Sequence, residues 1–239
     1  MRKTVSAAGA LTLLAALAFA APAQAGGKDD DNHHDDDARL SVLHGVPDTP
    51  VDVWVNGKLT LNDFKPGDLA GPLKLDDGTY KIAITAADAT SADNPVIGPV
   101  KVNLKEGRDY TAVAHLDAEG APTATLFKND TSPSPKGQGK LTVRHVAAAP
   151  AVDVLAGGPA VIEGLENPEQ KVLTLKAGTV SASVAAAGTT EPLIGPADVP
   201  VTKGKNTIVY AWGSLADDTL DVAVQVVDSK PRGHDRHDR

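Results

Sequence analysis

Cysteine is absent from all 239 residues of the sequence. This absence excludes disulfide bonds, and it also excludes a lipid anchor on a cysteine at a cleavage site. A folded chain without these covalent supports must draw its stability from packing, so each domain needs a hydrophobic core of its own.

Aromatic residues are scarce as well, with two tryptophans, three tyrosines and three phenylalanines. Proteins that bind glycans commonly stack sugars on aromatic rings, and the sequence offers one candidate platform of this kind, Trp54. Strand alternation places Trp54 on the face opposite Val53 and Val55, so it is a candidate ligand contact. The alternative is that the ring packs beneath a loop or between domains.

Long hydrophobic runs are missing after the N-terminus. The one apolar run, from Ala7 to Ala21, spans about fifteen residues, fewer than the roughly 18 that a transmembrane helix needs. Arg2 and Lys3 precede this run, and a small-residue triplet ending in Ala25 follows it. These features are typical of a secretory signal peptide cut after Ala25. We therefore expect a secreted, extracellular protein without membrane insertion, whose association with a cell wall would be noncovalent.

Acidic residues outnumber basic ones, and the formal net charge is −8. An acidic body offers no basic stripe for phosphate contacts, so we expect no nucleic acid partner. The two ends differ from the body. Residues 26–38 hold Lys28 against six aspartates, whereas residues 230–239 hold four lysines or arginines against two aspartates. We call these segments the acidic arm and the basic tail.

Both terminal segments contain histidine and aspartate, which are ligands for divalent metals. The candidate metal ligands are His33 and His34 in the acidic arm and His234 and His237 in the basic tail. Their spacing is not that of an ordered scaffold, so we expect no resident cofactor beyond a loosely bound divalent metal. The alternatives are solvated arms that keep the chain soluble, or weak contacts between the arm of one molecule and the tail of another.

An internal repeat organises the chain. The frame L-x-V-x-H followed by V-D-V occurs at residues 40–57 and again at residues 141–158, with seven of eighteen positions identical. Two later blocks repeat in the same order: LDDGTYKIAI at 75–84 answers LKAGTVSASV at 175–184, and residues 97–115 answer residues 194–212. Length changes fall between the blocks, which indicates a duplicated domain whose loops have drifted.

Within the repeated blocks the hydrophobic period is two. Leu40, Val42 and His44 share one face of a predicted strand, and Asn56-Gly57 supplies the residues that a two-residue hairpin turn prefers. No window shows sustained helical periodicity. Many short strands separated by Gly, Pro and Asp turns predict an all-β fold, with two tandem immunoglobulin-like antiparallel β-sandwich domains joined by a short linker.

The composition also predicts the boundaries. The linker is assigned to a polar stretch rich in Pro and Gly, which is typical of an exposed connection. The predicted order is a signal peptide (1–25), the acidic arm (26–38), the first sandwich (39–128), the linker (129–139), the second sandwich (140–229) and the basic tail (230–239).

The residues of the repeat resemble a known family. RLSVLHGVPDTPVDVWVNGK at 39–58, L-x-x-G-T-Y at 75–80 and YTAVA at 110–114 are similar to the bacterial family called domain of unknown function 4397. The second half resembles it more weakly, so the sequence is identified as two tandem copies. The resemblance implies an exported protein with immunoglobulin-like domains, and it implies no known activity.

The repeated histidine and aspartate are the candidate site residues of the body. His44 and Asp52 recur as His145 and Asp153, and in each repeat the histidine ends one strand while the aspartate opens the next. One interpretation is a His–carboxylate dyad that acts as a base or orients a metal ligand. The preferred interpretation is structural, with each imidazole satisfied by the carboxylate or by a backbone carbonyl at the rim of the core. No Ser or Cys nucleophile stands at a suggestive spacing, so we expect no catalytic residues.

These observations favour an exported, non-catalytic structural or binding module at the bacterial cell envelope or in the medium. Its expected partners are cell-wall polymers, which the basic tail could contact, or another envelope protein. The alternative is a secreted metal-binding or metal-buffering protein that uses the terminal histidines and aspartates. A third interpretation is a hydrolase that uses His44 or His145.

Overall fold

The structure, a computed structural model, describes residues 37–230. This part of the chain contains strands and loops only, and so it holds no helix that could cross a membrane. The strands are β1 (Ala38–Gly45), β2 (Val51–Val55), β3 (Lys58–Phe64), β4 (Leu69–Leu75), β5 (Gly78–Ala86), β6 (Ile97–Leu104), β7 (Asp109–Leu116), β8 (Pro122–Lys128), β9 (Gln138–Ala148), β10 (Val152–Ala156), β11 (Ala160–Leu165), β12 (Gln170–Lys176), β13 (Gly178–Ala186), β14 (Pro192–Val201), β15 (Lys205–Ser214) and β16 (Asp221–Asp228).

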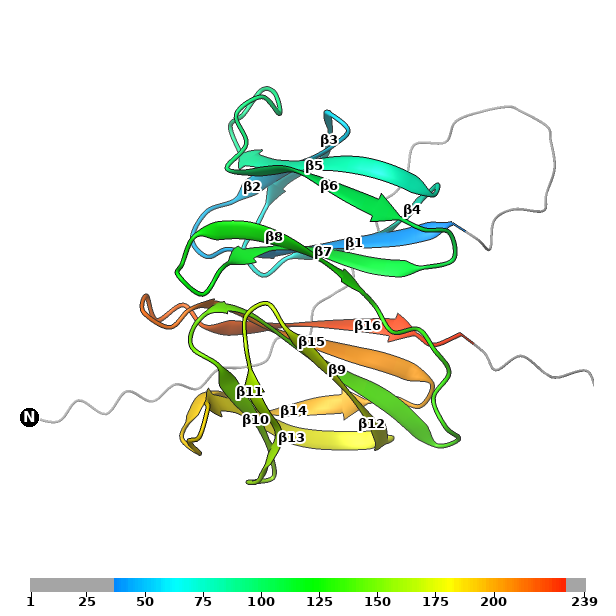
Figure 1. Cartoon of the computed structure of the whole chain (residues 1–239), viewed down its shortest axis with the longest axis vertical. Helices are drawn as coiled ribbons and strands as arrows, with labels where there is room; N and C mark the ends of the chain where they lie inside the picture. The colour runs from blue at the N-terminus through cyan, green and yellow to red at the C-terminus, as the bar shows by residue number, and fades with distance from the viewer. Residues whose placement is uncertain (1–36, 231–239) are drawn as a thin grey trace, which may run out of the picture. The chain divides into compact units, whose positions relative to one another are not determined.

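The strands form four four-stranded sheets (Figure 1). In the first half, the sheet β4-β1-β7-β8 packs on the sheet β3-β2-β5-β6. The second half repeats this order, with β12-β9-β15-β16 packed on β11-β10-β13-β14. The predicted all-β fold of two sandwiches is confirmed, and both halves share one topology.

Each sandwich contains one parallel pair of strands, whereas the sequence predicted antiparallel pairing. β1 pairs with β7, and β9 pairs with β15, in parallel, while all other strand pairs among residues 37–230 are antiparallel. Between β1 and β7 the chain crosses to the other sheet twice, through β2-β3 and through β5-β6, and returns once as β4, so that β7 enters beside β1 in the same direction. A hydrophobic period of two carries no information about strand direction, which is why the sequence did not predict this pair.

Local sequence explains the turns. Asn56 and Gly57 both have positive φ, at 51° and 79°, and join β2 to β3 in the tight hairpin that the Asn-Gly pair predicts. Gly157 and Gly158 occupy the equivalent turn of the second sandwich, with φ of 64° and 120°. Glycine and asparagine are favoured at such positions because other residues with a Cβ rarely adopt positive φ.

Each sandwich has its own hydrophobic core, formed by alternate residues of the two sheets. The buried residues of the first core include Leu40, Val42, Val53, Ile84 and Leu104. Those of the second include Leu141, Val143, Val154, Leu165 and Val201. The repeated frame therefore places the same apolar positions in both cores.

A third hydrophobic cluster joins the two halves. β1 and β9 are buried on both faces. In an isolated sandwich, the outer face of each sheet would be exposed to solvent. Their outward residues meet across the facing sheets β4-β1-β7-β8 and β12-β9-β15-β16 (Figure 1). The cluster comprises Leu43, Val113 and Phe127 from the first sandwich and Val146, Ile208, Tyr210, Trp212, Ala223 and Val227 from the second. The sandwiches are therefore docked on one another, not merely tethered.

Because the halves share this cluster, we expect them to unfold together. Leu40→Ala, which removes a fully buried side chain from the first core, should destabilise the chain by about 2–5 kcal/mol. In a Trp54→Phe background, Trp212 of the second sandwich reports the transition by fluorescence during urea unfolding. The Trp212 midpoint should fall along with the midpoint from circular dichroism, and an unchanged Trp212 midpoint would show that the halves unfold separately.

Candidate functional site

The most elaborate polar arrangement in residues 37–230 lies between the facing sheets of the two sandwiches. We call this interface the seam. It consists of the third hydrophobic cluster together with five buried polar residues, Ser41, Thr111, Asn129, Arg144 and Gln225. Buried polar groups are costly unless each one finds a partner, so the contacts of these five decide how the sandwiches fit together.

Arg144 on β9 is fully buried in the seam. Its Nη1 donates to the Tyr210 hydroxyl at 2.6 Å, and its Nη2 donates to Asn129 Oδ1 at 2.8 Å. Its Nε donates to Gln170 Oε1 at 2.9 Å. The guanidinium also lies over the Phe127 ring, with Cζ 4.4 Å from the ring centroid, which is a favourable cation–π arrangement. All three nitrogens are thus engaged within the protein.

Asn129 links the positive charge of Arg144 to the negative charge of Asp109. Burial lowers the pKa of Arg144, but a guanidinium remains protonated in proteins, so the seam holds a buried positive charge. Asn129 links it to the carboxylate of Asp109, because Asn129 Nδ2 donates to Asp109 Oδ1 at 2.5 Å. Burial raises the pKa of Asp109, while the Asn129 hydrogen bond and the charges of Arg39 and Arg144 act to lower it. Asn129, at the end of the first sandwich, therefore connects two buried ionisable groups.

A second chain of hydrogen bonds crosses the seam. The Tyr210 hydroxyl donates to Gln225 Oε1 at 2.6 Å, and Thr111 Oγ1 donates to the same oxygen at 2.9 Å. Gln225 Nε2 then donates to Ser41 Oγ at 3.1 Å. Burial raises the pKa of Tyr210, so its hydroxyl keeps the proton that it donates. Because these partners come from both sandwiches, a shift of one sheet over the other would leave several buried groups unpaired.

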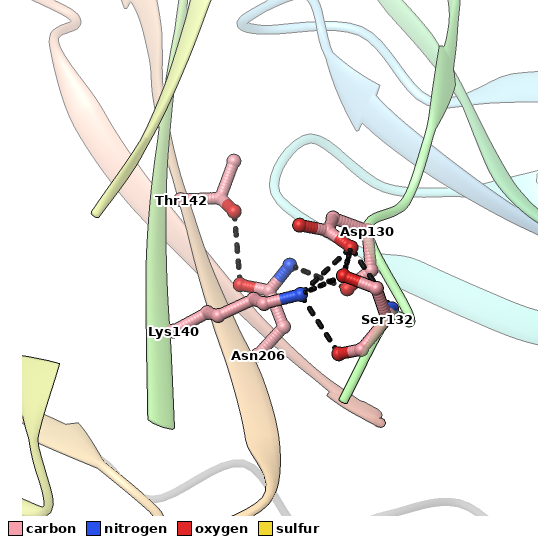
Figure 2. A network of polar contacts seen from close by, with 5 residues as sticks. All are labelled: Asp130, Ser132, Lys140, Thr142 and Asn206. Carbon is pink, nitrogen blue, oxygen red and sulfur yellow. Dashed lines mark hydrogen bonds and ion pairs between the residues drawn. The ribbon is translucent and has the colours of Figure 1, made fainter. Parts of the chain in front are cut away.

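The linker is fastened to the second sandwich (Figure 2). Lys140 Nζ forms an ion pair with Asp130 Oδ1 at 2.8 Å and donates to the Ser132 carbonyl at 2.8 Å. Asn206 Nδ2 donates to the Asp130 carbonyl at 3.1 Å, and Asn206 Oδ1 accepts from Thr142 Oγ1 at 2.9 Å. The linker, which the sequence predicts to be an exposed connection, is thus held against the second sandwich at its first residues. These contacts further restrict the motion of one sandwich relative to the other.

His44 and Asp52 hold different backbone groups of the first sandwich. Nε2 of His44 donates to the Thr49 carbonyl at 2.8 Å, while its Nδ1 accepts from the Val46 N–H at 3.4 Å. Asp52 Oδ1 accepts from the N–H of Asp63 at 2.9 Å, where β3 has a positive φ of 51°. The histidine therefore pins the turn after β1, and the aspartate pins an irregularity in β3.

His145 and Asp153 repeat this division of roles. Nε2 of His145 donates to the Pro150 carbonyl at 3.0 Å, and its Nδ1 accepts from the Ala147 N–H at 3.4 Å. Asp153 accepts from the N–H groups of Gly164 and Gly188, both at 2.8 Å. In both repeats the histidine and the aspartate bind separate backbone groups, so the structure places them in two contacts and not in one dyad.

His115 on β7 is a buried histidine that the repeated frame did not single out. It is fully buried, with Nδ1 donating to the Leu116 carbonyl at 2.8 Å and Nε2 bonded to Thr125 Oγ1 at 2.9 Å. Burial lowers its pKa, and the nearby His145 of the second sandwich lowers it further. The repeat did contain a signal for the importance of this position. When residues 97–115 are aligned with residues 194–212, His115 matches Trp212, and both side chains face the seam.

The two tryptophans are both buried, which corrects the interpretation of Trp54 as a ligand platform. Trp54 is only 8% exposed, and its Nε1 donates to Thr85 Oγ1 at 3.0 Å. Trp212 packs against the first sandwich, since a Cβ at Gly45 or Gly67 would lie 3.2 or 3.1 Å from its side chain. Glycine at these two positions thus makes room for the ring in the seam.

The candidate metal ligands His33, His34, His234 and His237 lie outside the described residues. Between residues 37 and 230, the structure contains no group of three or more His, Cys, Asp or Glu side chains that could hold a metal ion. The described histidines are instead committed to backbone and hydroxyl partners.

Asn129 should be a critical support of the seam. Asn129→Ala would leave the Arg144 guanidinium and Asp109 without their link, and we expect a loss of about 3–5 kcal/mol. Gln170→Ala is the matched control, because Gln170 also accepts from Arg144 but is exposed, and it should cost about 1 kcal/mol or less. Urea unfolding of the two variants measures the difference, and equal losses would contradict this role of Asn129.

The buried histidines should make the protein sensitive to acid. Burial lowers the pKa of His44, His115 and His145 below the usual 6.5, so the unfolded chain binds more protons than the folded chain below that pH. Their stabilising contribution is complete above about pH 6.5 and is lost as the pH falls below it. Thermal melts between pH 7 and pH 5 should show a falling midpoint.

Variants at these histidines provide the control for the pH series. His145→Gln keeps a side-chain donor near the Pro150 carbonyl but cannot be protonated, so its melting temperature should depend less on pH than that of the wild type. An identical pH dependence would show that His145 does not contribute to the acid sensitivity.

Comparison with known proteins finds one family and no match among curated proteins. The family model covers residues 38–155, which include the whole first sandwich and β9 and β10 at the start of the second. The family predicted from the repeated frame is confirmed, while its presence as two copies remains a prediction. Residues 38–155 of this chain belong to the family described as a domain of unknown function (DUF4397).

Proposed function

We propose that the chain is an exported, non-catalytic module of the bacterial cell envelope or the surrounding medium, in which two sandwiches act as one rigid unit. The observation that carries this proposal is the seam. A fully buried Arg144 with three hydrogen-bonding partners fits one docking register, so the sandwiches present their remaining surfaces in a fixed arrangement.

The hydrogen bonds of the buried histidines and aspartates support the proposal that the protein is not an enzyme. His44 and His145 hold turns, and Asp52 and Asp153 accept backbone N–H groups. A catalytic base needs a nitrogen or oxygen free to take a proton from a substrate. Both ring nitrogens of each histidine, both oxygens of Asp153 and Oδ1 of Asp52 have backbone partners within their own sandwich.

The proposed partners are cell-wall polymers or another envelope protein. The seam covers one sheet of each sandwich, which leaves the outer faces of β3-β2-β5-β6 and β11-β10-β13-β14 for contact with a partner. A rigid pair of such faces binds an extended partner with less loss of conformational freedom than two tethered domains would.

Export and envelope association can be tested together. When the whole gene is expressed in a bacterial host, the protein should appear in the envelope fraction or the medium, with Gly26 as its first residue. The purified chain 26–239 should also sediment with cell-wall material. Retention of the leader in the cytoplasm would contradict export, and a chain that stays in the supernatant at both low and physiological salt would contradict envelope binding.

A second candidate function is metal binding by the terminal segments. It is favoured by the positions at which the acidic arm and the basic tail join the described unit. The Arg39 N–H donates to the Arg108 carbonyl at 2.8 Å, and Lys230 Nζ donates to the adjacent Gly107 carbonyl at 2.8 Å. The acidic arm and the basic tail therefore leave the described unit beside the same turn. This proximity would let histidines from both segments share one divalent ion.

Zinc titration of the chain 26–239 by calorimetry tests this second candidate. If one ion is shared, replacing His33 and His34 by alanine should weaken binding, and replacing His234 and His237 should weaken it as well. Binding should also weaken below about pH 6.5, where free histidines become protonated. If either pair can be removed without effect, the ion is not shared between the two segments.

A further inference from the structure

The edge strand β16 lacks the features that keep the edges of sheets from pairing with other chains. Edge strands carry unpaired backbone groups, and proteins protect them with lysine, with proline or with an irregular register. Among the eight edge strands of residues 37–230, seven contain at least one of these protections. β16, with the sequence DVAVQVVD, contains neither lysine nor proline, and its register with β15 has no shift.

The hydrogen bonds at the ends of β16 show which of its backbone groups face outward. The Ser229 N–H donates to the Gly204 carbonyl, on the side of β15. Because N–H groups alternate in direction along an unbroken register, those of the even-numbered residues in the range 222–228 point away from β15. The first of them, the Val222 N–H, donates to Asp221 Oδ1 at 2.7 Å instead. The three that follow it remain available to a partner strand.

Two valines of β16 are exposed on the face opposite the seam. Ala223, Gln225 and Val227 are buried in the seam, and the residues that alternate with them point the other way. There Val224 and Val226 are 47% and 51% exposed, because β14 lies beside β9 and β15 and leaves this face of β16 uncovered. An apolar strip therefore runs along the free backbone edge.

The equivalent strand of the first sandwich, β8, is protected. β8 lies beside β6, which closes that side of the first sandwich. The repeat and the strand registers place Leu126 where the second sandwich has Val224, and Lys128 where it has Val226. Leu126 packs on the first core, and Lys128 puts an exposed charge on the edge. The open edge is thus a property of the second sandwich and not of the shared topology.

The charges at the two ends of β16 differ. Asp217 and Asp218 in the preceding turn and Asp221 at the first position of the strand are all exposed. None of them belongs to either of the two ion pairs within 4 Å in residues 37–230. At the other end, Asp228 is paired with Lys205 at 2.9 Å. The edge therefore attracts cationic groups at its start.

We propose that β16 binds an extended segment of another polypeptide as a fifth strand of the sheet β12-β9-β15-β16. The segment has apolar residues at alternate positions, which cover Val224 and Val226, and basic residues at the end that meets the acidic start of β16. Backbone hydrogen bonds supply the affinity of such strand addition, and side chains supply its specificity. Antiparallel pairing is the more stable, so the basic residues stand at the C-terminal end of the segment. A second copy of β16 fits less well, because this strand contains no lysine or arginine.

Amide hydrogen exchange, measured by NMR on the chain 26–239, tests the proposal. The probe is a synthetic peptide of alternating valine and threonine that ends in two lysines, with alternate amides methylated so that only one of its edges can pair. In the free protein, the amides of Val224 and Val226 should exchange fast, whereas those of Gln225 and Val227, which face β15, should exchange slowly. Addition of the peptide should slow the exchange of Val224 and Val226 several-fold. This readout does not depend on whether the protein is exported or binds cell-wall material.

Two variants at one position separate backbone pairing from apolar contact. Val226→Pro removes an outward N–H but no hydrogen bond to β15, so the melting temperature should stay close to that of the wild type. Peptide affinity, taken from a chemical-shift titration, should fall about tenfold or more in this variant, because proline cannot donate to the added strand. Val226→Thr is the matched control. It keeps the N–H and the branched shape, so it should bind the peptide nearly as well as the wild type.

A second peptide, with aspartates in place of the two lysines, tests the charge of the partner. It should bind several-fold more weakly than the lysine peptide at low salt, and the difference should vanish at about 1 M salt, where the Debye length is about 3 Å. The proposal is overturned if the lysine peptide leaves the exchange of Val224 and Val226 unchanged, if Val226→Pro binds it as well as the wild type, or if both peptides bind equally at low salt. Protection of these two amides that grows with protein concentration alone would overturn it too, because a second copy would then occupy the edge.

Discussion

The buried guanidinium of Arg144 is the constraint on which the arrangement of this molecule depends. A charge in that position requires partners from several directions, and it finds them in Tyr210 beside it, in Gln170 on β12 and in Asn129 at the end of the first sandwich. Asn129 then connects the charge to Asp109. Because the partners come from both halves, separating the sandwiches would leave Arg144 and Asp109 without the groups that compensate their burial.

The seam also shows where two sandwiches of one topology differ from each other. The repeat places Leu43 at the position that Arg144 occupies in the second copy, and Val113 at the position of Tyr210. The pairings of β8 and β16 place Phe127 where the second copy has Gln225. At these three positions the first sandwich supplies apolar side chains, and the second supplies the polar groups of Arg144, Tyr210 and Gln225.

Much of the fold followed from the sequence, because it depends on local patterns. The alternation in L-x-V-x-H and V-D-V predicted the core positions Leu40, Val42 and Val53, and the Asn56-Gly57 pair predicted its hairpin. The seam could not be predicted from the sequence. A strand whose outer face is buried can have the same sequence pattern as one whose outer face is exposed to solvent, because the difference lies in the element that packs on it. Leu43 and Val113 look like ordinary outward residues, and Arg144 looks like a surface arginine. The sequence left Trp54 open between a ligand contact and interior packing for the same reason, because its burial depends on tertiary packing.

The central claim is that the two sandwiches form one rigid body in solution, and backbone ¹⁵N relaxation of the chain 26–239 tests it most directly. The ratio of transverse to longitudinal relaxation rates gives a rotational correlation time for each sandwich separately. A rigid seam predicts one common correlation time, that of a particle containing both sandwiches, for the amides of β1–β8 and β9–β16. Two shorter correlation times, each near that of a single domain of about 100 residues, would show that the sandwiches tumble independently and would contradict the account.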